Sequence, residues 1–202
     1  MASIYDLKPR FQGLLRPLVQ RLAASGITPN QVTLAAFGLS AAEGLLILLF
    51  PASAWPLLLL PLALLLRMAL NAIDGMLARE HEMESALGAI LNELGDVLSD
   101  GAIYLPLAYV PGVPAALVVV AVVLAVIGEM AGLVGGALGG GRRYDGPMGK
   151  SDRAFVFGAI GLLLGLGVEP GIWLDALLGI VVLLLLVTIV NRARRALDQA
   201  AR

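Results

Sequence analysis

The chain has no cysteine and only one histidine, His81, among its 202 residues. Disulfide bonds and cysteine-ligated metals are therefore excluded, and a histidine-based metal site would lack a second histidine. Charged residues are also scarce, at 14% against about 25% in an ordinary soluble domain. The formal net charge of −1 gives no indication of a nucleic-acid partner. What remains is a chain that is 59% hydrophobic.

Long hydrophobic runs occupy most of the sequence. A helix that crosses a bilayer needs about 20 mostly apolar residues, and we expect six such spans, at residues 31–50, 54–74, 86–108, 114–135, 153–168 and 172–190. Residues 5–24 mix basic and apolar side chains at helical spacing, which fits either an amphipathic helix on the membrane surface or a simple positively charged anchor. The predicted fold is therefore an all-α polytopic membrane protein in a single domain. Its parts are an interfacial helix (1–28), a six-helix bundle (29–195) and a tail (196–202).

The basic residues predict the orientation of this bundle. All 14 lysines and arginines lie in the N-terminal segment, the junction between the second and third spans, the loop between the fourth and fifth, or the C-terminal tail. The three other turns contain none. By the positive-inside rule, both termini face the cytoplasm of an inner membrane.

The stretch from Asn71 to Asp100 is polar where its surroundings are apolar, and ionisable groups at membrane depth predict a functional site. Helical spacing puts two sets of residues on one face each, with a turn between them: Asn71, Asp74, Gly75 and Ala78, then Gly88, Asn92, Asp96 and Asp100. Two facing helices would bring these oxygens together. Carboxylate and amide oxygens suit a hard cation such as Mg²⁺, Mn²⁺ or Ca²⁺. Nearby basic residues would suit a phosphate ligand: Arg79, Arg142, Arg143, Lys150 and Arg153.

This stretch resembles the signature of the CDP-alcohol phosphotransferase family, D-x2-D-G-x2-A-R-x8-G-x3-D-x3-D. Six of its eight specified residues are present at the correct spacing: Asp74, Gly75, Ala78, Arg79, Gly88 and Asp96. The number of spans, the amphipathic N-terminus and the sequence GITPNQVTL before the first span are also similar, and the chain looks most like a YnbA-like branch of the family. The resemblance implies an enzyme of phospholipid biosynthesis. It would transfer a substituted phosphoryl group from a CDP-linked donor such as CDP-diacylglycerol to a small alcohol or alcohol phosphate, with release of CMP.

The resemblance also implies roles for individual residues. Asp74 would ligate a divalent metal, Mg²⁺ or Mn²⁺, and Asp96 would be the catalytic base. Four residues would line the nucleotide site: Gly75, Ala78, Arg79 and Gly88. Independently of the resemblance, the charge of the basic residues fits the phosphate of an acceptor, although Lys150 and Arg153 also fit a simple helix start; these residues are Arg142, Arg143, Lys150 and Arg153. A homodimer in a lipid membrane is the expected assembly.

Two positions depart from the signature, because its first and third acids are the amides Asn71 and Asn92 here. Both can ligate through a carbonyl oxygen, but two negative charges are lost. Glu93 or Asp100 could restore charge, and we prefer Asp100 because it shares a helix face with Asp96. The expected metal set is therefore Asn71, Asp74, Asn92, Asp96 and Asp100. Three outcomes stay open: a one-metal enzyme, a two-metal enzyme with altered ligands, or a lipid or nucleotide binder without turnover.

Two further acids lie inside predicted spans. Glu129 is either a site residue or the partner of a nearby arginine, and Glu43 must face protein or water rather than lipid. A transporter of small anions is the remaining rival. It would carry its polar residues near the middle of the membrane, whereas the polar cluster here lies near one face.

Overall fold

In the computed structural model of the protein, the backbone is described for residues 4–142 and 144–200, and the side chains for residues 11–138, 141–142 and 144–200. These residues form helices and connecting segments, without a strand, as predicted. The helices are α1 (Ile4–Ala24), α2 (Pro29–Leu49), α3 (Ala54–Glu80), α4 (Ala86–Tyr104), α5 (Ala115–Gly135), α6 (Lys150–Gly165) and α7 (Ile172–Ala200). A 3₁₀ segment, η1 (Leu105–Tyr109), follows α4, and a π-helical segment, η2 (Gly136–Gly140), follows α5.

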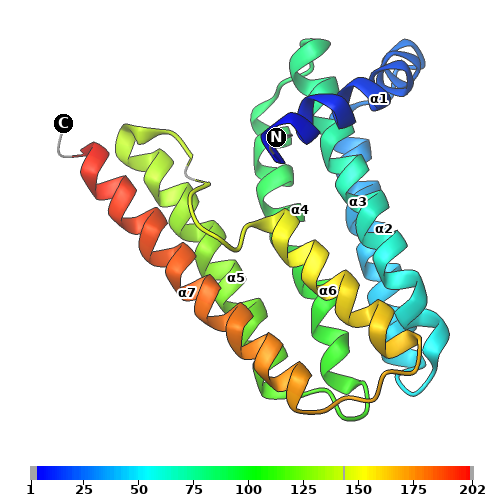
Figure 1. Cartoon of the computed structure of the whole chain (residues 1–202). Coiled ribbons are helices and arrows are strands. Elements are labelled where there is room, and N and C mark those ends of the chain that lie inside the picture. Colours follow the sequence, from blue (N-terminus) through cyan, green and yellow to red (C-terminus); the bar gives the residue numbers. More distant parts are fainter. Residues whose placement is uncertain (1–3, 143, 201–202) are drawn as a thin grey trace.

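The helices run up and down so that alternate connections meet at the same end. The N-terminal helix, the α3–α4 connection, the α5–α6 loop and the C-terminal end of α7 lie at one end, and the other three connections lie at the opposite end (Figure 1). The closest helix pairs are α5 with α7, α2 with both α3 and α4, and α3 with α6. Helix α1 lies across the first end and contacts α3 (Figure 1).

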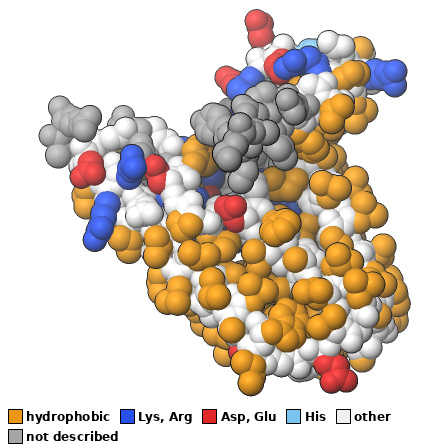
Figure 2. All heavy atoms as spheres, viewed as in Figure 1, with side chains coloured by type: hydrophobic (Ala, Val, Ile, Leu, Met, Phe, Trp, Pro, Cys, Tyr) orange, Lys and Arg blue, Asp and Glu red, His pale blue; other side chains and the backbone are white. Residues whose placement is uncertain are grey.

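Four helical segments of the described chain are long and apolar enough to cross a membrane: Pro29–Leu49, Ala54–Glu80, Ala115–Leu138 and Ile172–Ala200. The other two predicted spans, which correspond to α4 and α6, are less suited to cross a membrane for physical reasons. Helix α4 contains Glu93, Asp96 and Asp100, and α6 has only 16 residues. Six spans therefore stay a prediction. Hydrophobic side chains cover most of the lower body, while Lys and Arg side chains gather toward the upper end (Figure 2).

Local sequence explains where α2 and α4 begin and where α4 ends. Thr28 caps α2, because its hydroxyl accepts the Gln31 N–H while the Gln31 side chain accepts the Thr28 N–H. The Ser85 hydroxyl accepts the Gly88 N–H at 3.0 Å and so starts α4. The α-helical part of the predicted span 86–108 ends at Tyr104, followed by the 3₁₀ segment η1. Pro106 accounts for this change, because it has no N–H to continue the α-helical pattern.

Helices α2 and α4 approach so closely that only glycine fits between them. A Cβ atom on Gly44 would lie 1.9 Å from the carbonyl oxygen of Ala102, which is backbone and cannot turn aside. Small residues at helix crossings allow such contact in membrane bundles. This contact fixes α2 against α4 and brings Thr33, on α2, close to the polar stretch.

Candidate functional site

A cavity of about 1430 Å³ lies in the end of the bundle that α1 crosses, and residues of α1 through α7 line it. Ten of the predicted site residues are among them: Asn71, Asp74, Gly75, Ala78, Arg79, Gly88, Asn92, Asp96, Arg142 and Lys150. The structure thus brings the two predicted helix faces together at one site. Arg143 lies outside the described residues, and Asp100 and Arg153 are absent from the described lining.

The α3 side of the cavity is built around Asp74, which is buried, with 5% of its surface exposed. The Thr33 hydroxyl donates a hydrogen bond of 2.9 Å to Oδ2 of Asp74. The neighbouring Asn71 also lines the cavity, and its buried Nδ2 has no hydrogen-bond partner among the described residues. A buried amide without a partner is costly, so this donor is available to a ligand.

Small residues widen the cavity beside these groups. A Cβ atom on Gly75 would lie 3.0 Å from Nη2 of Arg79, and one on Gly88 would lie 2.9 Å from Oδ1 of Asn30. Glycine at both positions leaves room for the Arg79 guanidinium and the Asn30 amide to lie against the helices, where both side chains line the cavity.

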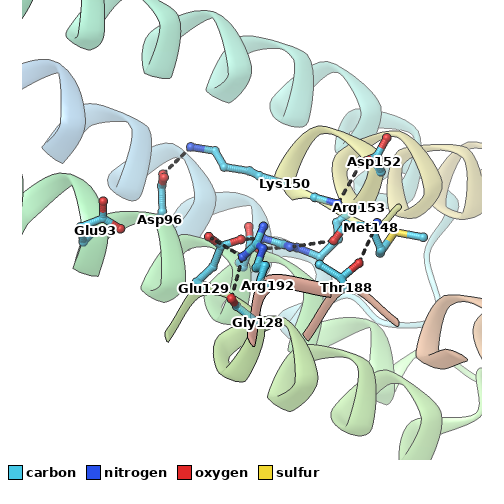
Figure 3. Close-up of polar contacts among 12 residues, drawn as sticks. Glu93, Asp96, Gly128, Glu129, Met148, Lys150, Asp152, Arg153, Thr188 and Arg192 are labelled. Atoms are coloured by element: carbon cyan, nitrogen blue, oxygen red, sulfur yellow. Dashed lines mark hydrogen bonds and ion pairs between the residues drawn. The ribbon is translucent and has the colours of Figure 1, made fainter. Parts of the chain in front are cut away.

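On the α4 side, Asp96 is paired with a cation. The ammonium of Lys150, the first residue of α6, donates to Oδ1 of Asp96, and Lys150 reaches across the cavity to meet it (Figure 3). Among the described residues, no other side chain is hydrogen-bonded to the Asp96 carboxylate. Its second oxygen can therefore receive a proton or a ligand.

Asp100 lies one helical turn beyond Asp96 but is committed elsewhere. Its Oδ1 accepts from Nη1 of Arg67 at 2.6 Å, and its Oδ2 accepts from Nε of Arg153 at 2.9 Å. Only 2% of its surface is exposed. Two arginines thus occupy both oxygens, and the geometry gives no support to Asp100 as a metal ligand. Arg153 is likewise a partner of Asp100 and Glu129 rather than part of the described cavity lining.

Glu129 fits both roles that the sequence allowed, a residue of the site and the partner of an arginine. It lines the cavity, and it also pairs with Arg142 at 3.0 Å, Arg153 at 3.1 Å and Arg192 at 3.3 Å. Arg142 reaches back from the loop after η2 to bond Glu93 as well. We call this set the charge cluster; its members are Arg67, Glu93, Asp100, Glu129, Arg142, Arg153 and Arg192 (Figure 3 shows its α5–α7 part). Four arginines face three acids in it.

Sequence reasoning missed two arginines and one threonine of this region. In the sequence, Arg67 and Arg192 counted only as positive charges that orient the bundle, although each is almost fully buried in the structure. A signal existed, because an arginine inside an apolar span requires an acidic or carbonyl partner. Arg67 has both, since its Nη2 also donates to the backbone carbonyl of Asp96 at 3.1 Å. Thr33 gave no comparable signal, because threonine is common in apolar helices.

The cavity fits a divalent cation only if amide oxygens take part. Within the described residues no three His, Cys, Asp or Glu side chains are grouped so that they could hold a metal ion. Asp74 and Asp96 are two carboxylates, and Asn71 and Asn92 add two amides to the same lining. Mg²⁺ is commonly bound by one or two carboxylates together with substrate phosphates. The oxygen-only donor set therefore fits such an ion, with part of its shell supplied by the ligand.

The chain is similar to known proteins over most of its length. The model of the CDP-alcohol phosphatidyltransferase family matches residues 26–190. The Escherichia coli inner membrane protein YnbA is 46% identical over 201 residues, which cover 98% of each chain. A second Escherichia coli inner membrane protein, YnjF, is 42% identical over 82 residues, covering 41% of this chain and 37% of YnjF.

Solved structures share the fold. Mycobacterium tuberculosis phosphatidylinositol phosphate synthase with CDP-DAG bound has a TM-score of 0.74 at 19% identity, over 89% of this chain and 92% of that one. The same enzyme in complex with manganese and citrate has a TM-score of 0.74 at 19% identity, over 89% and 87%. The family predicted from the signature is confirmed: the chain belongs to the CDP-alcohol phosphatidyltransferase family.

Proposed function

We propose that this protein is an integral membrane transferase that moves a phosphatidyl group from CDP-diacylglycerol to a small alcohol or alcohol phosphate and releases CMP. The observation that carries the proposal is the meeting of the α3 and α4 signature faces in one large cavity. Family membership supports the transfer reaction, and the solved relative with CDP-DAG bound supports a lipid-linked donor.

The chain's own residues have distinct parts in this reaction. Asp96 takes the proton of the acceptor hydroxyl, whose oxygen then forms a bond to the lipid-bearing phosphorus of the donor. The bond between that phosphorus and the bridging oxygen breaks, and CMP leaves with the oxygen. Gly75, Ala78, Arg79 and Gly88 line the wall where the CDP group binds. One general base of this kind contributes about 10²–10⁴-fold to the rate.

Asp74, with the amide oxygens of Asn71 and Asn92, would hold a divalent ion, Mg²⁺ or Mn²⁺, and Asp96 would act as the base beside it. When bound, the ion would neutralise diphosphate charge during transfer. The solved relative in complex with manganese supports this assignment. Asp100 is left out of the set, because arginines occupy both of its oxygens.

The acceptor would bind on the side of α5, α6 and α7. Arg142, Lys150 and Arg192 line the cavity there. Arg142 and Arg192 belong to the charge cluster, which has one more arginine than acids. Such an excess of positive charge favours an alcohol that carries a phosphate, such as glycerol phosphate or inositol phosphate.

The placement in the membrane follows from the same architecture. We infer that α2 to α7 all cross the inner membrane, with α1 on the cytoplasmic surface and both termini in the cytoplasm. The connections that carry lysine and arginine lie at the end where α1 lies (Figure 1), and the positive-inside rule assigns that end to the cytoplasm. A single domain and a homodimer stay predictions.

The experiment is CMP release from CDP-diacylglycerol by the purified protein in lipid, with Mg²⁺ or Mn²⁺ and a panel of alcohols and alcohol phosphates. We expect release that depends on both metal and acceptor, and a loss of at least about 10²-fold in kcat for Asp96→Asn. Asp198→Asn, on the exposed end of α7, is the matched control and should behave as wild type.

A binder without turnover is the second candidate, and Asn71 and Asn92 in place of two signature acids favour it. It predicts that CDP-diacylglycerol binds and that no acceptor yields CMP above the Asp96→Asn level. Binding without release, across the whole panel, would replace the transferase assignment with this one.

A further inference from the structure

Lys150 places a fixed positive charge inside the cavity at one of the two signature acids that remain. Its Nζ contacts Oδ1 of Asp96, and the two side chains are 22% and 14% exposed (Figure 3). The family signature has four acids in this region. This chain has two, Asp74 and Asp96, and Lys150 pairs with one of them.

The segment that carries Lys150 is anchored by packing, so the position of the ammonium is determined by the fold. The Met148 N–H donates to the Thr188 hydroxyl of α7 at 3.0 Å, and the Gly149 N–H donates to Oδ2 of Asp152 at 2.9 Å. Gly146, with φ of 122°, lies against the same threonine, where a Cβ atom would be 2.6 Å from Thr188 Cγ2. The start of α6 is thereby held against α7 while Lys150 extends toward α4.

Charge decides how many divalent ions such a cavity can hold. Two adjacent divalent ions, which lie about 3.5–4 Å apart in two-metal sites, bring four positive charges, which the signature acids and the donor diphosphate must offset together. The remaining signature acids provide two negative charges, and Lys150 already offsets one. A second divalent ion beside Asp96 would also meet the ammonium at short range and be repelled by it.

We propose that this protein binds one divalent ion, on the Asp74 side of the cavity, and that the Lys150 ammonium occupies the place beside Asp96 that a second ion would need. The Lys150 ammonium then faces the diphosphate as a positive group in the place of a second metal ion. The inference rests on the proposed function, because it takes the ligand of the cavity to be a metal-bound diphosphate.

Manganese binding tests this without any measurement of turnover. The purified protein in lipid is titrated with Mn²⁺ in the presence of CDP-diacylglycerol, and bound Mn²⁺ is counted per chain and examined by electron paramagnetic resonance. We expect one Mn²⁺ per chain, with the spectrum of an isolated ion. Two Mn²⁺ per chain with a spin-coupled spectrum would overturn the inference and leave the transferase assignment intact. No bound Mn²⁺ would overturn both the inference and the proposed metal site.

Substitutions at Lys150 then separate charge from packing. Lys150→Gln removes the charge, and we expect Mn²⁺ to bind at least about tenfold more tightly. Lys150→Arg keeps the charge and should bind as wild type, as should Arg194→Gln, which removes an exposed cation of α7. Equal affinity of the Gln and Arg variants would contradict the proposed role of the ammonium, and size-exclusion profiles show whether each variant is folded.

Discussion

The Nη1 atom of Arg67 lies 2.6 Å from Oδ1 of Asp100, and each side chain is no more than 3% exposed. The pair joins α3 to α4 directly behind the cavity, and Nη2 of the same guanidinium holds the backbone carbonyl of Asp96. Asp100 therefore helps to hold α4 against α3, whereas Asp96 faces the cavity. Two acids one turn apart on the same helix face thus have different surroundings.

Removing Asp100 should destabilise the protein strongly. Asp100→Ala leaves Arg67 and Arg153 buried without their shared acid, and breaking a buried ion pair in this way costs about 3–5 kcal/mol. Thermal unfolding in detergent measures the loss, with Asp198→Ala, at the exposed end of α7, as control. A melting temperature for Asp100→Ala equal to that of the control would show that the cluster does not support the fold.

The crossing of α2 and α4 gives a second stability prediction. Gly44→Ala puts a Cβ atom against the Ala102 carbonyl, so the helices must separate, and we expect a loss of about 1–3 kcal/mol. Gly38→Ala is the matched control on the same helix, because nothing lies within 4 Å of its Cβ position. The control should be neutral or gain up to about 1 kcal/mol from helix propensity. Equal unfolding curves for the two variants would contradict the close approach.

Sequence periodicity predicted well which residues form helices and share a helix face. It predicted poorly which side chains bond to one another between helices. The spacing of Asn71, Asp74, Gly75 and Ala78 was enough to place all four on one wall, because helical geometry is local. It could not show that Arg153, 53 residues away, would bond Asp100, because that contact depends on how α6 packs. Asp100 was preferred as a ligand for this reason: its face was known, while its neighbours were not.

The same limit applies to two arginines whose role the sequence explained in only one way. Arg67 and Arg192 fitted the positive-inside pattern, which explained their presence without a partner. Their burial became evident only once the helices were packed together. The apolar runs at residues 86–108 and 153–168 predicted two further spans, whereas the acids of α4 and the short length of α6 set these helices apart from the four long apolar ones.

Nucleotide binding should depend on the Arg79 guanidinium, which lies against Gly75. Gly75→Ala places a Cβ atom 3.0 Å from Nη2 of Arg79, which is the mobile end of a long side chain, so the fold is kept while the guanidinium moves. We expect KM for CDP-diacylglycerol to rise about tenfold, which corresponds to about 1.4 kcal/mol of binding. Gly101→Ala on α4 has nothing within 4 Å and is the control. An unchanged KM for Gly75→Ala would remove Arg79 from the donor site.

Restoring the two missing acids should strengthen metal binding. The double variant Asn71→Asp and Asn92→Asp adds two negative charges to the cavity lining, and we expect the Kd for Mn²⁺ to fall at least about tenfold. Asn191→Asp, on α7 beside Arg192 but not itself among the residues that line the cavity, adds a charge of the same sign and serves as control. Identical Mn²⁺ titrations for the double variant and wild type would refute the charge argument at these positions.

The position of the bound ion tests the central claim most directly. A crystal of the protein with Mn²⁺ and CDP-diacylglycerol, measured at the manganese absorption edge, locates each ion by its anomalous signal. We predict a peak between α3 and α4, at about 2.0–2.6 Å from a carboxylate oxygen of Asp74, with the donor diphosphate completing its shell. A peak bound by residues outside the Asn71–Asp96 stretch, or a diphosphate held away from both helices, would contradict the account.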